Sequence, residues 1–490
     1  AEAVLNEVGL RQAMFGHDLE GGSFVLRVDR AKLSVMGAGL SDGVPFRLNV
    51  TRSLKPADHG FTSFTLQSHL DEAAREKFSL DEVPLAGTMG VSVAGTASGA
   101  GAAQMTVSLD LGQASLALAA LGWTKAKGVP AEAKIGLVFE GGRVTAIPEA
   151  ELNGAGMEAR FRASFGDVQS RTLPTRIEIE RFTVGETDLQ GTVTPNADGV
   201  WRVSLHGRSF DAGTLMKAIN KDSGGAELGA IPLIIEAKLD RVVLGPDRVA
   251  SGVSGQVYSD GVHFQAASLD ARLQNGRQIR LRFGKVAGQQ SLRLSTDDFG
   301  GVLSLFDISK NVIGGGFEFS GVVSEEAGHP VLRGDVKGTD YRVVGAPLFA
   351  RLLAVTSFSG WQATLNGEGL PFSTLRAEVV LDQGRLGLAN LGAYGGPLGI
   401  NLHGMIDDPA GTLDLSGTLV PFYGVNSFLG KIPVLGDLLL GGEGQGIFGA
   451  NFRVAGPIAD PKISVNPLSA LAPGALRRLF LFEPGDPAPQ

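Results

Sequence analysis

The sequence predicts a mainly β protein, built on a long, twisted and curled antiparallel sheet with a few short helices. Three observations predict this fold class. Apolar and polar residues alternate with a period of two in many segments, as in strands with one buried face. Turn signals recur about every ten residues, as in an antiparallel meander. Glycine makes up 70 of the 490 residues, about twice the usual ~7%, and glycines in strands mark bends of a sheet that curls.

The clearest hairpin lies in the second half of the chain. Residues 269–273 and 278–284 alternate apolar and charged side chains on either side of Asn275 and Gly276, a strong hairpin signal. A two-residue loop would mix the two faces, so we expect a longer loop that sets Leu273 opposite Ile279. Alternation here and in two further segments predicts the following residues on one apolar face: Leu269, Leu273, Ile279, Leu281, Phe283, Leu292, Leu294, Leu413 and Leu415.

The remaining elements follow from the same signals. We expect about thirty strands in total, given the spacing of the turns. Further alternation predicts strands at residues 176–180, 200–205, 291–295, 412–416 and 462–465. Apolar helical stretches predict short helices at residues 70–78, 211–220, 300–308, 347–355 and 425–440. The helices recur at irregular intervals, which indicates diverged modules that each consist of strands closed by a helix.

No Pro/Ser-rich linker divides the interior of the chain, and the short glycine-containing segment 221–229 is the best candidate boundary. We therefore expect a first β region over residues 1–220 and a second over residues 221–482, with a helical segment near 425–440. The tail 483–490 is Pro-rich, and we expect it to be disordered.

Composition excludes several classes of protein. The chain has 43 basic and 51 acidic residues, a formal charge of −8, whereas nucleic-acid binding usually needs a basic stripe. Cysteine is absent, which excludes disulfides, Cys-ligated zinc and thiol nucleophiles. No apolar run approaches the ~18 residues that a spanning helix needs. The chain begins at Ala1 without a signal-peptide pattern, so we expect it to be a piece of a longer protein.

The sequence contains little that indicates catalytic chemistry. The seven histidines are scattered, without the spacing of a metal site. Residues 444–449 match Gly-x-Gly-x-x-Gly, but the residues that follow alternate like a strand, whereas a dinucleotide site needs a helix there. Adjacent acidic residues fall in turns or near helix starts, where they cap or solvate the backbone. The sequence therefore predicts a protein that is not an enzyme and has no cofactor or metal.

Residues 419–448 form the most apolar stretch, and Lys431, Asp437 and Glu443 are its only charges. Two interpretations stay open. The stretch is either a buried helical plug that packs on the sheet, or a segment that meets a membrane or closes the end of a cavity. The candidate membrane-proximal residues are Phe422, Phe428, Leu429, Val434, Leu438 and Leu439.

The C-terminal part of the chain resembles a known family. Leu-Asp-Leu-Ser-Gly-Thr at 413–418, Ile-Pro-Val-Leu-Gly-Asp-Leu-Leu at 432–439 and Gly-Pro-Ile-Ala-Asp-Pro-Lys-Ile-Ser-Val-Asn-Pro-Leu at 456–468 resemble the C-terminal region of AsmA-like proteins. These are bridge-like lipid-transfer proteins of the YhdP and TamB type, from the envelope of Gram-negative bacteria. Residues 121–130 and 198–207 resemble the domain that precedes this region in the same family.

The resemblance implies a long β-sheet curled into an elongated open groove with an apolar interior, which carries phospholipid between the inner and outer membranes without catalysis. It also implies a periplasmic location and an inner-membrane anchor at an N-terminus that is missing here. The implied partners are phospholipids, the inner membrane through that anchor, and the outer membrane or envelope proteins at the C-terminal end.

Alternation alone leaves two structures open: an apolar face packed shut, as in a sandwich or barrel, or a face left open as a trough for acyl chains. It also leaves open a second function, a periplasmic scaffold or assembly factor for outer-membrane proteins, whose sheet edges recruit client strands. A third possibility, an envelope enzyme acting on glycan, would require a clustered pair of acids, which the sequence does not show.

Overall fold

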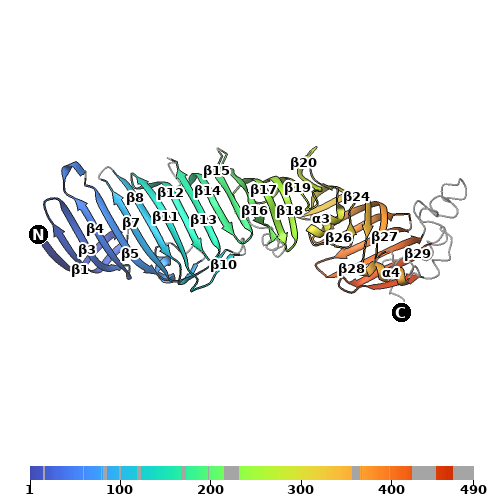
Figure 1. The fold of residues 1–490 in the computed structure, drawn as a ribbon, viewed down its shortest axis with the longest axis horizontal. Helices are drawn as coiled ribbons and strands as arrows, with labels where there is room; N and C mark the ends of the chain where they lie inside the picture. The colour runs from blue at the N-terminus through green and yellow to red at the C-terminus, as the bar shows by residue number, and fades with distance from the viewer. Residues whose placement is uncertain are drawn as a thin grey trace. The chain divides into compact units, whose positions relative to one another are not determined.

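A computed structural model places strands over 72% of the protein and helices over 7%, so the prediction of a mainly β fold with a few short helices is confirmed (Figure 1). The sheet is not closed into a barrel. The structure describes residues 1–14, 17–58, 60–78, 80, 85–98, 101–118, 123–166, 173–196, 198–213, 231–355, 365, 367–396, 398–421 and 449–466.

The chain divides into two compact units, which we call unit 1 (Ala1–Pro246 with Ser259–His263) and unit 2 (Asp247–Tyr258 with Phe264–Gln490). The strands of unit 1 are β1 (Glu2–Met14), β2 (His17–Val28), β3 (Lys32–Ser41), β4 (Val44–Ser53), β5 (Thr62–Leu70), β6 (Leu85–Gly87), β7 (Met89–Ala97), β8 (Ala102–Asp110), β9 (Ala114–Leu118), β10 (Trp123–Lys125), β11 (Ala131–Glu140), β12 (Arg143–Gly154), β13 (Met157–Phe165), β14 (Pro174–Val184), β15 (Thr187–Pro195), β16 (Trp201–Asp211) and β17 (Leu233–Gly245). Its described helices are a 3-10 turn, η1 (Pro56–Asp58), and α1 (Glu72–Lys77).

Unit 1 is a ladder in which each strand pairs with the next, from β1 to β5 and on through β7, β8 and β11 to β16, always antiparallel. Figure 1 shows these strands side by side, from blue to green. The last pair, β16 and β17, is parallel, which departs from the antiparallel meander that we predicted. A parallel neighbour needs a connection of about a dozen residues or more, and residues 212–232 supply that length. Strands β6, β9 and β10 form a separate small sheet.

Unit 2 continues with the same kind of ladder. Its elements are β18 (Arg248–Ser259), β19 (Phe264–Arg272), β20 (Gln278–Val286), β21 (Gln289–Thr296), α3 (Phe299–Leu305), β22 (Val312–Ile313), β23 (Gly316–Glu326), β24 (His329–Val343), α4 (Pro347–Val355), β25 (Leu370–Asp382), β26 (Arg385–Tyr394), β27 (Leu398–Asp407), β28 (Thr412–Pro421), β29 (Ala450–Pro457) and β30 (Lys462–Asn466). Antiparallel pairing runs from β19 to β21 and from β23 to β30, and β21 pairs directly with β23.

The predicted hairpin between β19 and β20 forms, but its register differs from our prediction by two residues. Leu269 lies opposite Leu281, and Ala271 lies opposite Ile279. The loop has three residues, closed by Leu273 N–H donating to Arg277 O at 2.8 Å, with Gly276 at φ +82°. This is a turn followed by a glycine bulge, a common three-residue hairpin. A shift of two residues keeps every side chain on its predicted face.

Three predicted helices occur close to where we expected them, as α1, α3 and α4. Asp71 and Asp298 begin α1 and α3 as N-caps, because their carboxylates accept from Ala74 N–H and Gly301 N–H, each at 2.9 Å. Segments 214–220, 221–229, 425–440 and 483–490 of our predictions lie outside the described residues, and Asp211 is the last residue of β16. In the described part of the chain, no helix is both long and apolar enough to cross a membrane.

Candidate functional site

The most prominent feature of unit 1 is a row of apolar residues that crosses the sheet from strand to strand. Each member lies directly opposite the next in the pairing register, and none is polar. We call this set the unit 1 row: Leu5, Phe24, Gly37, Leu48, Leu66, Val93, Val107, Ile135, Ala150, Phe161, Ile179, Gly191, Leu205 and Ala237.

The unit 1 row is only partly sealed from solvent. Leu48, Leu66, Val107 and Ile135 are half-buried, and Phe161 is 36% exposed. The inner face of a β-sandwich would instead interdigitate with a second sheet and lose its exposure. The apolar face of unit 1 is therefore an accessible surface along much of its length.

One border of this face is covered. Ala74 of α1 and Ala114 of β9 are buried in one cluster with Leu70, Met89 and Ala131 of the main sheet. Three sets of hydrogen bonds fix the covering elements. Arg75 donates to Leu85 O and Gly87 O at 2.6 Å each, Trp123 Nε1 donates to Ala155 O at 3.0 Å, and Lys125 Nζ donates to Ala114 O at 2.7 Å. The helix and the small sheet thus form a fixed wall along one side of the face.

The opposite face of unit 1 is charged. Arg160 pairs with Glu151 at 2.6 Å, and Arg181 pairs with Glu158 at 2.8 Å across neighbouring strands. Hydrogen bonds from Arg176 and Arg162 lower the pKa of Glu178 below its ordinary value. The sheet is therefore amphipathic, with one face that stays hydrated and one that is apolar.

Unit 2 repeats this arrangement. A second row runs from β19 to β30 in direct register, again without a polar member. We call this set the unit 2 row: Ala267, Phe283, Leu292, Gly321, Gly334, Val379, Leu388, Gly404, Leu415, Val454 and Ile463.

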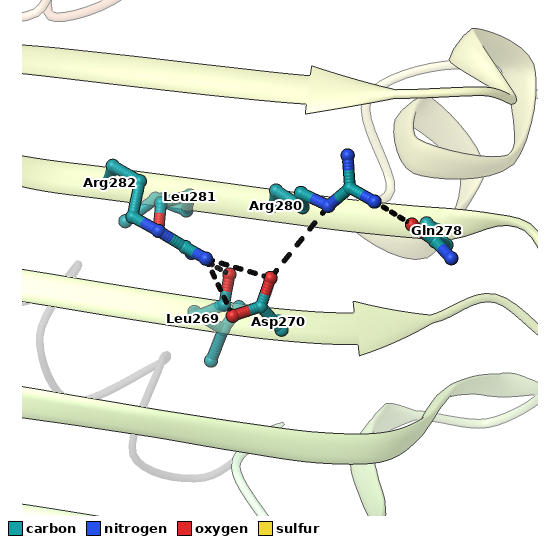
Figure 2. Close-up of polar contacts among 6 residues, drawn as sticks. All are labelled: Leu269, Asp270, Gln278, Arg280, Leu281 and Arg282. Carbon is teal, nitrogen blue, oxygen red and sulfur yellow. Dashed lines mark hydrogen bonds and ion pairs between the residues drawn. The ribbon is translucent and has the colours of Figure 1, made fainter.

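Charged residues occupy the other face of unit 2, as Figure 2 shows for β19 and β20. Arg282 Nη2 donates to both oxygens of Asp270, at 2.7 and 2.9 Å, and its Nη1 donates to Leu281 O and Leu269 O at 2.8 and 3.0 Å. Arg280 hydrogen-bonds Gln278 on the same strand. Because Leu269 and Leu281 alternate with these residues, their side chains point to the apolar face.

The structure brings all nine predicted apolar-face residues onto the apolar face of unit 2, in two environments. Leu269, Leu281, Phe283, Leu292 and Leu294 are half-buried. The other four are buried: Leu273, Ile279, Leu413 and Leu415. The six candidate membrane-proximal residues lie outside the described residues: Phe422, Phe428, Leu429, Val434, Leu438 and Leu439.

Three of the four buried residues lie in regions of the core to which α3 or α4 contributes. Leu273 lies against α3, because a Cβ on Gly301 would lie 2.5 Å from Leu273 Cδ1. Leu413 and Leu415 belong to one core cluster together with Leu352 and Leu353 of α4. The apolar face of unit 2 is therefore partly open over β19 to β21, whereas over β28 it is buried in a core cluster to which α4 contributes.

Sequence reasoning missed the aromatic cluster that joins α3 to the sheet. Phe299 stacks on Phe317 with ring centroids 4.7 Å apart, and Tyr341 stacks on Phe372 at 5.4 Å. Phe299 also meets Tyr341 edge to face at 5.8 Å. Burial raises the pKa of Tyr341 above its ordinary value. Phe299 and Tyr341 precede the expected helices 300–308 and 347–355 in the sequence, but their partners Phe317 and Phe372 come from other strands.

The described residues contain no group of three or more His, Cys, Asp or Glu side chains that could hold a metal ion. Comparison with known protein families, with curated proteins and with solved structures finds no match to this chain.

Proposed function

We propose that this protein transfers phospholipids between the inner and outer membranes without catalysis. The acyl chains of each phospholipid bind to the apolar faces of the sheet. The observation that carries the proposal is the register of the two rows. Apolar residues follow one another from strand to strand without a polar interruption, and many remain half-exposed. Exposed apolar surface of this extent is typical of binding sites.

The chemistry of an acyl chain suits such a surface. Each methylene that leaves water for an apolar contact contributes about 0.8 kcal/mol, and it needs no hydrogen-bond partner. A row without polar residues offers similar apolar contacts on every strand. An acyl chain can therefore move along the row without being bound strongly at any one position. The charged face keeps the other side of the sheet hydrated. Single wall residues should then be exchangeable for other apolar residues, whereas an inserted charge should block movement.

The cellular setting in this proposal comes from the AsmA-like resemblance of the C-terminal segments. It includes a periplasmic position, an inner-membrane anchor, and outer-membrane or envelope proteins as partners near the C-terminal end. Phospholipid is the proposed cargo, and no nucleic acid or cofactor takes part.

Photo-crosslinking in cells tests the proposal. A benzophenone amino acid replaces Phe161 or Phe283 on the apolar faces, and their neighbours Arg162 or Arg282 on the charged faces serve as matched controls. We expect phospholipid adducts at the two phenylalanine positions and few at the arginine positions. Equal lipid labelling on both faces, or none on either, would refute a lipid-binding face.

The alternative function is a periplasmic scaffold for outer-membrane proteins, and exposed apolar residues of β1 favour it. Val4 and Leu10 are 61% and 55% exposed, and exposed apolar side chains can contact a client protein. A scaffold therefore predicts protein adducts at Leu10 and no lipid adducts at Phe161.

A further inference from the structure

A small pocket opens on the apolar face of unit 1 between β4, β5, β7 and the end of α1. Its volume is about 130 Å³, and its walls are almost entirely apolar. Phe46, Leu66 and Val91 line it from the sheet, and Phe78 lines it from the residue that follows α1. Leu66 is also a member of the unit 1 row, so the pocket is continuous with the accessible face.

Two serines line this pocket, and they differ in whether the hydroxyl group has a hydrogen-bond partner. Ser68 Oγ donates to Pro45 O at 2.8 Å. Ser41 is only 4% exposed, and among the described residues no group hydrogen-bonds its Oγ. A buried hydroxyl without a partner costs stability, whereas alanine at the same place would not. Ser41 therefore has the property expected of a group that hydrogen-bonds a ligand.

The position of Ser41 is fixed from both sides. It pairs with Leu19 on β2 and with Val44 on β4, and the turn after it has Asp42 and Gly43 at φ +49° and +79°. These are the angles of a tight two-residue hairpin. Because Ser41 alternates with Gly39 and Gly37, its side chain points to the apolar face.

The wall formed by α1 is anchored to the same hairpin. Lys77 Nζ donates to Asp42 O at 2.7 Å, which ties the last turn of α1 to the turn beside Ser41. Phe78 follows directly and lines the pocket. The hydroxyl and its aromatic neighbour are thus held in one rigid corner of the face.

We propose that this corner binds the head of an acyl chain. The ester carbonyl oxygen accepts a hydrogen bond from Ser41 Oγ, the first carbons fill the pocket beside Phe78, and the rest of the chain lies along the unit 1 row. An apolar cavity of about 150 Å³ holds one benzene molecule, so 130 Å³ holds a few carbons and not a whole lipid. This inference rests on the proposed function and adds to it one site where a lipid pauses.

The test uses phosphatidylcholine whose acyl chain carries a photoreactive diazirine close to the ester, with the purified chain and peptide mapping of the adducts. We expect labelling at the pocket, at Leu66, Phe78 or Val91. Ser41→Ala should reduce this labelling about two- to tenfold, which is the net effect of one neutral hydrogen bond. Ser23→Ala removes an exposed hydroxyl outside the pocket that already donates to Asn6 Oδ1 at 2.9 Å, and it should leave the labelling unchanged.

Each remaining outcome decides one question. Pocket labelling that is equal in Ser41→Ala and the parent chain would overturn the inference. Labelling elsewhere on the face without labelling at the pocket would also overturn it but leave the proposed function intact. An unlabelled face would overturn both. A free fatty acid with the same diazirine distinguishes the source, because labelling by the acid alone would assign the oxygen to a carboxyl group instead of an ester. Thermal unfolding of Ser41→Ala should show unchanged or higher stability.

Discussion

Replacing Leu281 by aspartate places a carboxylate in the open part of the unit 2 apolar face. Leu281 lies directly opposite Leu269 on β19 and Leu294 on β21, and all three are half-buried. A half-buried leucine contributes only part of its full transfer free energy to folding. We therefore expect Leu281→Asp to lower the free energy of unfolding by about 1–2 kcal/mol. Unit 2 should therefore remain folded.

The effect on lipid binding should be larger than the effect on stability. Neighbouring strands are about 4.8 Å apart, so the width of one strand at Leu281 spans roughly three or four methylenes of an acyl chain that crosses the strands, and each methylene contributes about 0.8 kcal/mol. If a hydrated carboxylate removes two or three of these contacts, affinity falls by about 2 kcal/mol, or ~30-fold.

The assay measures the affinity of the purified chain for a phospholipid with a fluorescent acyl chain, and circular dichroism monitors folding. Ser320→Asp on β23 is the matched control, because Ser320 is exposed on the charged face opposite Arg293. It introduces the same poor strand former without touching the apolar face. A folded Leu281→Asp chain that binds lipid as tightly as Ser320→Asp would refute the reasoning.

Three further predictions concern stability and tolerance. Leu353→Ala in α4 should lower the free energy of unfolding of unit 2 by about 2–5 kcal/mol in denaturant unfolding, because Leu353 is fully buried. Leu348→Ala on the same helix should lower it by less than about 1 kcal/mol. Equal losses in the two variants would contradict the packing of α4. Hydrogen bonds from Arg453 lower the pKa of Asp414. Their stabilisation should be complete above about pH 4, the unfolded value, and be lost as the pH falls toward the folded pKa. Asp414→Asn should remove at most about 1 kcal/mol at neutral pH, and a loss that persists unchanged at pH 2 would contradict this assignment. Ile135→Leu should leave lipid binding unchanged, whereas Ile135→Asp should weaken it, and equal binding by both would argue against an apolar contact surface.

The alternation of side chains predicted the faces of the sheet better than its register. Leu269, Leu281 and Phe283 share a face as expected, because a strand has a strict period of two. Their pairing was wrong by two residues, because the loop is closed between Leu273 and Arg277. Turn geometry sets register, and the dipeptide Asn275-Gly276 is compatible with more than one hairpin loop.

Long-range contacts account for most of what the sequence could not predict. The helix at α4 was visible in its local pattern, but its packing near Leu413 and Leu415 joins segments about sixty residues apart. The parallel pair of β16 and β17 depends on a crossover without a strand pattern. Ser41 looks like any serine in an alternating strand, and only the neighbouring strands and Phe78 make it a buried, unpartnered group.

The most direct test of the central claim is a count of phospholipids per chain by native mass spectrometry, on protein purified from cells in mild detergent. An apolar face that conducts lipid should carry several phospholipids per chain, and Leu281→Asp should reduce that number while Ser320→Asp does not. A chain that carries no lipid and takes up none when phospholipid is added would contradict the claim and favour the scaffold.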